Sequence, residues 1–271
     1  MSTQKHLLTI EQLNKQYNEK DVLKTIDLTV NQGEFIVIIG PSGAGKSTLV
    51  RCINQLAQPT SGVVTFDGVP LTCLTGKRQR HVHGEIAMIF QHYNLVKKTN
   101  VIKNVLHGRL GKNPAWKTVL GLYTTAEKEA AIKLLETVGL GEHLYKKANT
   151  LSGGQMQRVG VSRALMQQPR LILADEPISS LDPTSATLIM DTIKKQVTEQ
   201  DVTVIMNLHQ IHYAKRYATR IIGLKAGEIV FDGAPELLTE ALIKDIYEGN
   251  MNEVTFTPQP AMKGELTYAM L

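Results

Sequence analysis

The sequence predicts an α/β fold with a parallel sheet at its core, and three apolar runs carry this prediction. They span Glu34–Gly40, Arg170–Asp175 and Val202–His209, and each is rich in branched aliphatic residues. Strands that are buried on both faces have such continuous apolar sequences, and parallel sheets provide that environment. A turn or a helix signal follows each run, as expected of strand–helix units packed in layers.

Two of the segments that follow these runs have the features of helices. Residues Lys46–Ala57 come after a glycine-rich turn, directly behind the first run. In the segment Leu181–Val197, Asp182 is placed to cap a helix with Pro183 at its first position. Proline is tolerated there because its missing N–H would have no partner within the helix.

The segments on either side of these runs predict antiparallel strands. Residues Ile26–Val30 alternate between apolar and polar, and Gly62–Gly68 has the pattern of an antiparallel edge strand. Residues Arg220–Gly233 are typical of a hairpin that turns at Ala226–Gly227. We therefore expect an antiparallel β subdomain beside the core.

The middle of the chain predicts helices only. No strong strand pattern occurs between about residues 100 and 147, and Thr125–Leu140 is amphipathic at helical spacing. We therefore expect one domain over residues 1–249, with its core at about 1–91 and 152–249 and a helical insertion at about 92–151. Residues 250–271 have little periodicity and are expected to form a loosely packed tail.

The composition excludes several classes of protein. A chain of 271 residues with 42% hydrophobic residues is long enough to bury a sizeable core. The net charge of +5 is small and the basic clusters are short, so they indicate solvated surface rather than a nucleic-acid site. Cys52 and Cys73 form no metal-binding pattern and are expected to stay reduced.

No part of the chain is expected to cross a membrane. The first residues lack the apolar centre of a signal peptide. No run approaches the roughly 18 apolar residues that a spanning helix needs.

A phosphate-binding loop follows the first apolar run. The stretch GPSGAGKST fits the pattern G-x-x-x-x-G-K-[ST] between a strand and a helix. Backbone N–H groups of such a loop and the helix N-terminus converge on phosphate oxygens, while Lys46 reaches the terminal phosphates and Ser47 offers its hydroxyl to Mg²⁺. The predicted cofactors are therefore ATP and Mg²⁺, and the fold class becomes a P-loop (RecA-like) nucleotide-binding core. The loop residues expected to bind nucleotide are Gly40, Pro41, Ser42, Gly43, Ala44, Gly45, Lys46, Ser47 and Thr48.

Polar residues at the ends of the other two runs predict catalytic groups. Asp175 and Glu176 directly follow four apolar residues, at the sheet edge where α/β proteins bind ligands. We expect Asp175 to serve the metal and Glu176 to orient or deprotonate an attacking water. His209 ends the third run and is placed to contact the γ-phosphate and hold that water. With Lys46, Glu176 and His209 are the expected catalytic residues.

A second anion site is predicted at LSGGQ, where Gly153 and Gly154 stand at the start of a helix. Glycine weakens a helix start because it loses the most backbone freedom on folding. Together with the hydroxyl of Ser152, the bare backbone N–H groups at this helix N-terminus suit an anion that approaches closely. Ser152, Gly153, Gly154 and Gln155 are therefore expected to bind nucleotide.

The phosphate loop, LSGGQ and LILADEP together resemble the ATP-binding cassette (ABC) ATPases, over nearly the whole chain. In that family the LSGGQ segment of one subunit closes on ATP held by the other, so the resemblance implies a homodimer. Ser180, Leu181 and Asp182 resemble the loop that meets the partner's phosphate loop, and His209 resembles the family's switch histidine.

The resemblance also implies two further nucleotide contacts. Tyr17, ahead of the first expected strands, resembles the aromatic residue that stacks on adenine. Gln91 in MIFQ resembles the glutamine that senses the γ-phosphate and Mg²⁺ and reports them to the transmembrane partner. Ser47, Gln91 and Asp175 are thus the expected metal-site residues.

A single cassette without transmembrane helices resembles the separate ATPase subunit of a bacterial-type importer. The segments Gln91–Gly111, Trp116–Tyr123, Ala174–Pro183 and Asn207–Gly233 resemble the ATPase subunits of phosphonate importers. This implies uptake of phosphonates or a related phosphorus oxyanion, with transmembrane permease subunits, a periplasmic or extracellular substrate-binding protein, and a peripheral location on the cytoplasmic face of the inner membrane. Trp116 is expected to serve packing or an interface.

Three alternatives differ in function. Because substrate does not touch this subunit, an importer of phosphate or of an amino acid fits the same residues. ABC ATPases of nucleic-acid repair separate the two nucleotide motifs by long coiled coils, whereas only about 100 residues without sustained heptads lie between them here. A small-molecule kinase would lack LSGGQ. We therefore expect no nucleic-acid partner.

Overall fold

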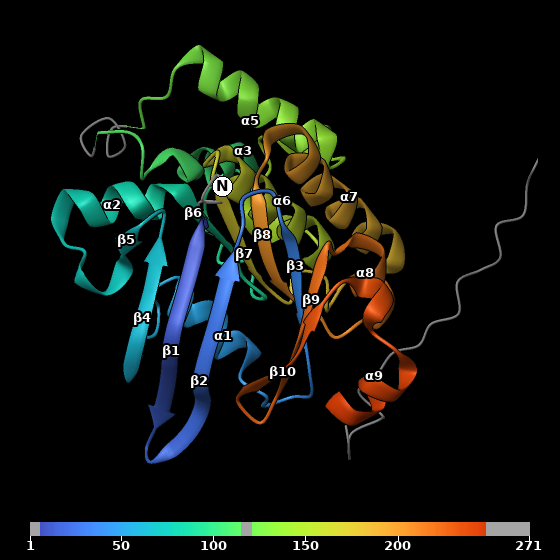
Figure 1. Ribbon diagram of the computed structural model, residues 1–271. Helices are drawn as coiled ribbons and strands as arrows, with labels where there is room; N and C mark the ends of the chain where they lie inside the picture. Colours follow the sequence, from blue (N-terminus) through green and yellow to red (C-terminus); the bar gives the residue numbers. More distant parts are fainter. Residues whose placement is uncertain (1–5, 115–120, 248–271) are drawn as a thin grey trace, which may run out of the picture.

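The computed structural model describes residues 6–114 and 121–247, and its strands form two sheets (Figure 1). The expectations for Trp116 and for the tail 250–271 fall outside the described residues. None of the helices in the described part is long and apolar enough to cross a membrane.

A six-stranded sheet in the order β10-β9-β3-β8-β7-β6 forms the core. Its strands are β3 (Phe35–Ile39), β6 (Ile86–Ile89), β7 (Leu171–Asp175), β8 (Thr203–Asn207), β9 (Arg220–Lys225) and β10 (Glu228–Gly233). All neighbours pair in parallel except β9 and β10, which form the predicted hairpin around Ala226–Gly227. The three apolar runs are the adjacent central strands β3, β8 and β7, which confirms the prediction of a parallel sheet.

An antiparallel sheet in the order β2-β1-β4-β5 lies beside the core (Figure 1). It contains β1 (Leu8–Tyr17), β2 (Lys20–Val30), β4 (Ser61–Phe66) and β5 (Val69–Pro70). The expected edge position of β4 is wrong, because the chain turns back after Phe66 and adds the two-residue strand β5 outside it. Tyr17 does not precede the first strand but ends it.

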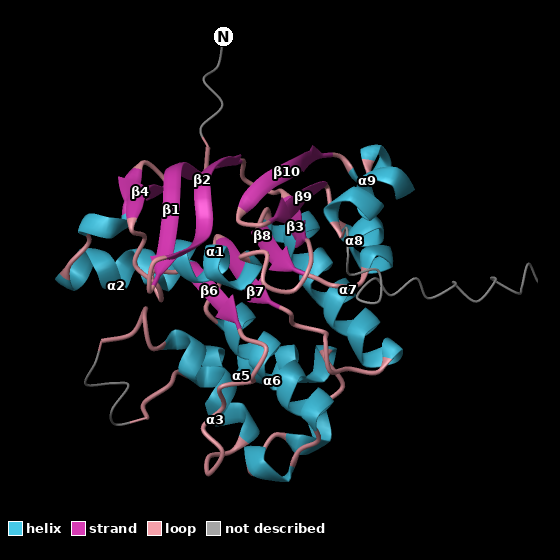
Figure 2. Ribbon diagram, turned by 90° about the horizontal axis from the view of Figure 1, so that it is seen from below, coloured by secondary structure: helices cyan, strands magenta, loops and turns pink. Residues whose placement is uncertain are grey.

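The described helices cover both faces of the core sheet and extend beyond one end of it (Figure 2). They are α1 (Lys46–Ile53), α2 (Gly76–Glu85), α3 (Val101–Leu106), α5 (Thr125–Thr137), α6 (Gly153–Met166), α7 (Pro183–Gln200), α8 (Ile211–Tyr217) and α9 (Glu240–Ile246). Short 3₁₀ turns occur at η1 (Leu71–Cys73), η2 (His107–Arg109), η3 (Gly141–His143), η4 (Ala148–Thr150) and η5 (Pro235–Leu237). Asp182 caps α7 as predicted, because its Oδ1 accepts a hydrogen bond of 3.0 Å from the Ser185 N–H.

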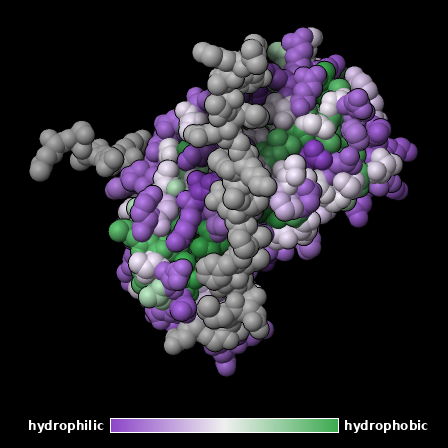
Figure 3. Space-filling view, turned by 90° about the vertical axis from the view of Figure 1, so that its right-hand side faces the viewer, coloured by the Kyte–Doolittle hydropathy of each residue, from purple (hydrophilic) through white to green (hydrophobic). Residues whose placement is uncertain are grey.

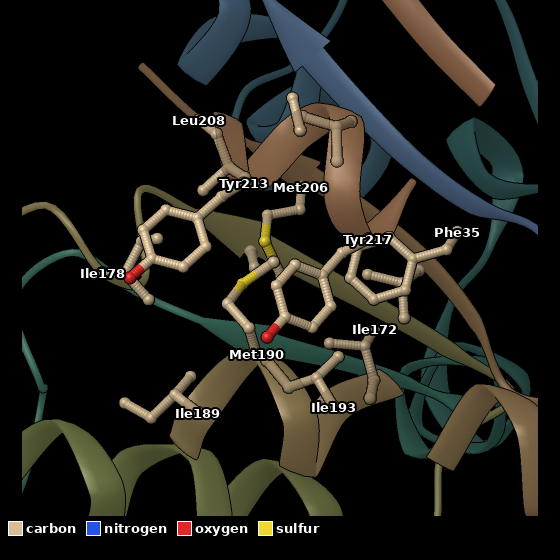
Figure 4. Packing of buried hydrophobic residues seen from close by; sticks show 14 of the residues in the cluster. Phe35, Ile172, Ile178, Ile189, Met190, Ile193, Met206, Leu208, Tyr213 and Tyr217 are labelled. Atoms are coloured by element: carbon tan, nitrogen blue, oxygen red, sulfur yellow. The ribbon is translucent and has the colours of Figure 1, made fainter. Parts of the chain in front are cut away.

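The two faces of the core sheet belong to different hydrophobic clusters. Leu171, Leu173 and Ile205 pack towards α1 and the antiparallel sheet. The intervening residues of the same strands pack towards α7 and α8, where Met190 and Met206 lie beside Tyr213 and Tyr217 (Figure 4). Side chains alternate between the two faces along a strand, so the position of a polar residue at a strand end, counted from these apolar residues, determines the face on which it lies.

A third cluster holds the helical part of the chain together. It joins α3, α5 and α6, with Val101, Leu135 and Val159 among its fully buried members. Other residues of α6 belong to the cluster that packs against the core sheet together with α7 and α8. This helix therefore connects the core sheet to the helical part of the chain. On the face shown in Figure 3, apolar areas are interspersed among hydrophilic side chains, as is usual for a protein surface.

Candidate functional site

The phosphate loop runs from the end of β3 to the start of α1 and holds its lysine inward. The Lys46 side chain is almost fully buried, and its Nζ donates to the carbonyl oxygens of Gly40 at 2.7 Å and Pro41 at 3.0 Å. These bonds keep the ammonium inside the curve of the loop. A cation in that position stabilises the terminal phosphates of a nucleotide.

Two distant segments fix the first residue of this loop. Gly40 has a φ of 147°, and a Cβ there would lie 2.0 Å from the carbonyl oxygen of Leu224 on β9, so no side chain fits. The Gly40 N–H donates to the hydroxyl of Tyr247, which is fully buried at the end of α9, over 3.1 Å. The loop is therefore shaped by β9 and α9 as well as by its own sequence.

Asp175 ends β7 on the α1 side of the sheet, in line with Leu171 and Leu173. Its Oδ1 accepts hydrogen bonds from Ser47 Oγ at 2.7 Å and from Asn207 Nδ2 at 2.8 Å. The guanidinium of Arg51 lies 3.7 Å from Oδ2. The structure thus brings Ser47 and Asp175 together as predicted, at the carboxyl ends of the parallel strands.

Glu176 leaves the strand with a φ of 50°, a conformation that is uncommon for a residue with a side chain. Its carboxylate is held from both sides: His209 Nε2 donates to Oε1 over 2.6 Å, and Gln91 Nε2 donates to Oε2 over 3.1 Å. The hydrogen bond from His209 lowers the pKa of the Glu176 carboxyl, nearby positive charge from His209 and Lys46 lowers it further, and burial opposes them. The carboxylate is therefore ionised and oriented at neutral pH.

The LSGGQ residues form the capped start of α6. Ser152 Oγ accepts from the Gln155 N–H at 3.3 Å, and Gln155 Oε1 accepts from the Ser152 N–H at 3.0 Å. A Cβ at Gly153 would lie 2.7 Å from the Tyr93 hydroxyl, whereas one at Gly154 would make ordinary contacts. The Tyr93 hydroxyl is the outer end of a side chain that can shift, so contacts within the chain do not by themselves require glycine at 153 or 154. Close approach by a second chain remains a prediction for both glycines.

A family model described as "ABC transporter" matches residues 23–179. This chain belongs to the ABC transporter family. It is 49% identical to "Phosphonates import ATP-binding protein PhnC 2" of Oceanobacillus iheyensis, over 92% of this chain and 98% of that protein. It is 47% identical to "Phosphonates import ATP-binding protein PhnC" of Treponema denticola, over 89% of this chain and 95% of that one.

Solved structures of ABC cassettes share this fold. The dimeric structure of a bacterial ABC transporter cassette superposes with a TM-score of 0.76 and 33% identity, over 84% of this chain and 98% of that one. A post-hydrolysis dimer of an ATP-binding cassette bound to ADP and Pi gives a TM-score of 0.75 at 32% identity, over the same fractions of the two chains. The predicted family and the P-loop α/β fold class are confirmed.

The predicted adenine-stacking residue of this ABC cassette stands at the surface. Tyr17 ends β1, is 46% exposed, and has the Lys15 ammonium 4.5 Å from the centre of its ring. An exposed ring in this position suits stacking on a base. Its role in nucleotide binding remains a prediction.

The structure adds contacts of the ABC site that sequence reasoning missed. Arg163 of α6 donates to the carbonyl oxygens of Asn94 at 2.7 Å and Tyr93 at 3.3 Å, and Gln157 Nε2 donates to that of Phe90 at 3.4 Å. These bonds attach the segment around Gln91 to the helix that begins with LSGGQ. The available signal was the presence of Gln157 and Arg163 among the mostly apolar and small residues of α6.

The donor set fits Mg²⁺. Ser47 and Asp175 supply hard oxygen ligands, and Asn207 Oδ1 is a buried acceptor without a hydrogen-bond partner among the described residues. No group of three or more His, Cys, Asp or Glu residues placed to hold a metal occurs in residues 6–114 and 121–247.

Proposed function

We propose that this chain is the ATP-hydrolysing subunit of an ABC importer, which couples MgATP binding and hydrolysis in a dimer to uptake of phosphonates or a related phosphorus oxyanion. The observation that carries the hydrolytic part is the Glu176 carboxylate, fixed between Gln91 and His209 next to the phosphate loop. The observation that supports the substrate is the name of relatives that are 44–49% identical, over about nine-tenths of this chain.

The loop residues Gly40–Thr48 bind the phosphates of ATP through their backbone N–H groups and the Lys46 ammonium. Ser47, Gln91 and Asp175 would hold Mg²⁺, which would supply positive charge to the phosphate oxygens. Arg51 and Asn207 hold the Asp175 carboxylate in one orientation beside Ser47.

Glu176 orients the attacking water and accepts its proton, and His209 fixes the Glu176 carboxylate. A carboxylate can only accept, so the proton of the 2.6 Å bond is carried by His209 Nε2. The second carboxylate oxygen is held by Gln91, so a γ-phosphate or metal that engages Gln91 would act on the same side chain that positions Glu176. Binding of the γ-phosphate and activation of the water are thereby linked through one side chain.

A homodimer completes the site. Ser152, Gly153, Gly154 and Gln155 form an anion site at the start of α6, and we assign their ligand to ATP held by the second copy. The related cassettes solved as dimers support this arrangement.

We further propose that residues 1–249 act as one ATPase domain with a helical insertion at about 92–151. In this assignment the domain lies at the cytoplasmic face of the membrane and drives the permease subunits. A separate substrate-binding protein delivers the transported substrate to those subunits. Nucleic acid is not among its partners.

The test is the ATPase activity of the assembled complex, reconstituted in vesicles with its native permease and binding protein. Methylphosphonate, phosphate, phosphite and an amino acid are compared as ligands, and a complex that contains Glu176→Gln is the inactive control. We expect stimulation by the phosphonate and none in the control.

Two other outcomes would contradict the proposal. Stimulation by the amino acid alone would refute the substrate and leave the importer. Stimulation by DNA without any membrane partner would refute both.

A further inference from the structure

Asn207 is the last residue of β8 and the only one of the described strand residues to bond the Asp175 carboxylate. We propose that Asn207 is a positioning residue of the Mg²⁺ site. Its amide N–H fixes the Asp175 carboxylate, and its carbonyl oxygen accepts a hydrogen bond from a water in the hydration shell of the metal. This proposal rests on the proposed ATPase function.

The sheet places the two side chains next to each other. Asn207 pairs with Asp175 in the parallel register of β7 and β8, so both side chains point to the same face. That face also carries Leu173 and Ile205, which pack towards α1. Ser47 therefore meets Asp175 from α1 while Asn207 meets it from the neighbouring strand.

The hydrogen bonds decide the orientation of the amide. An ionised carboxylate only accepts, so the group of Asn207 that lies 2.8 Å from Asp175 Oδ1 is the NH₂. The carbonyl oxygen then faces elsewhere, and it has no partner among the described residues although Asn207 is fully buried. Buried polar atoms are normally paired, so a buried acceptor without a protein partner beside a metal ligand indicates a ligand or a bound water.

Thr203 provides a comparison within the same strand and on the same face. It is also fully buried, but its hydroxyl accepts from the Gly33 N–H at 3.0 Å and lies 3.5 Å from the Asn31 carbonyl oxygen. A buried polar side chain at the amino end of β8 is therefore satisfied by the protein. The one at the carboxyl end, where α/β sheets bind ligands, is not.

The experiment measures metal binding rather than turnover. The full chain is loaded with a fluorescent ADP analogue in EDTA, and free Mg²⁺ is then raised while the fluorescence is recorded. The variant Asn207→Leu has a similar shape and makes no hydrogen bond, and Thr203→Val is the matched control for a lost buried hydrogen bond in the same strand.

We expect Asn207→Leu to raise the half-saturating Mg²⁺ concentration by about 10-fold or more, as outer-shell substitutions at metal sites do, and to leave nucleotide affinity in EDTA unchanged. Thr203→Val should lower the melting temperature without moving the Mg²⁺ midpoint. A midpoint for Asn207→Leu equal to that of the wild type would overturn the proposal.

The controls separate this proposal from the proposed function. A wild-type chain that binds no nucleotide would refute the ATPase assignment itself. If Asn207→Leu does not bind nucleotide even in EDTA, Asn207→Ser replaces it, because its shorter side chain is tolerated more easily and cannot span the distance to Asp175. An unchanged Mg²⁺ midpoint in that variant would equally overturn the role of Asn207.

Discussion

Replacing Glu176 with glutamine keeps the shape of the side chain and removes its charge. The variant can still accept from His209 through its amide oxygen, in place of the 2.6 Å bond. Its NH₂ then faces the Gln91 NH₂, so Gln91 has to turn its amide and present its oxygen for the 3.1 Å contact to persist between neutral groups. The phosphate loop is not altered, because Lys46 is held by the Gly40 and Pro41 carbonyl oxygens. ATP binding should therefore persist while the acceptor for the water proton is lost.

The size of the effect follows from that role. A positioned general base contributes about 10²–10⁴-fold, so kcat should fall by that factor. At about 1.4 kcal/mol for each factor of ten, this corresponds to roughly 3–5.5 kcal/mol of transition-state stabilisation. The dissociation constant for ATP should stay within about threefold of the wild type, because the ground-state contacts are retained.

Steady-state phosphate release and equilibrium ATP binding measure the two quantities separately. Size-exclusion chromatography with MgATP should also show a dimer that persists, since ATP is bound and not consumed. The matched control is Glu199→Gln, which removes an exposed carboxylate whose ion pair within the described part of the chain is with Lys195 at 3.8 Å. Turnover by Glu176→Gln within about threefold of this control would refute the assignment of Glu176.

Three further predictions concern the same site. His209→Ala should lower kcat more than it raises KM, because the histidine acts on the carboxylate that activates the water; a raised KM with unchanged kcat would reassign His209 to binding. Mixing Lys46→Ala chains with Ser152→Arg chains should give more ATPase activity than the sum of the separate variants, because each mixed dimer retains one intact composite site; no excess activity would contradict the shared site. The lowered pKa of Glu176 stabilises the fold above the ordinary glutamate pKa of about 4.3, and this contribution is lost as the pH falls through the lower folded pKa. Below about pH 4.5 the melting temperature of the wild type should therefore fall more steeply than that of Glu176→Gln, and parallel curves would show that the His209 contact does not contribute to stability.

The central strands could be predicted because both of their faces are buried. β3, β7 and β8 are fully buried along their whole length, so their sequences are apolar apart from the polar residues at the ends of β7 and β8. β1 could not be predicted in this way, because its pairing with β2 shifts register after Ile10 and the buried positions no longer alternate. β5 has only two residues, too few to show any period.

The candidate site likewise has a part that the sequence could predict and a part that it could not. The phosphate loop and the pair Asp175–Glu176 lie on short contiguous stretches, so local patterns reveal them. The contact between Gln91 and Glu176 joins residues 85 positions apart, and that between Arg163 and Asn94 joins residues 69 positions apart. The first contact depends on the pairing of β6 with β7, and the second on how α6 packs between the sheet and the helical part of the chain. No local pattern encodes either arrangement.

The hydrogen bond from the Gly40 N–H to the Tyr247 hydroxyl has a consequence for how the protein is made. It joins residues 207 positions apart, and the family model that matches this chain ends at residue 179. At about 5–20 residues per second, a ribosome needs roughly 10–40 s to add the residues between the two partners. During that interval the nascent chain carries a complete phosphate-loop sequence that lacks the tyrosine anchoring its first amide. A newly synthesised subunit therefore acquires its finished nucleotide cradle only near the end of translation, after the surfaces around α3, α5 and α6 have been made.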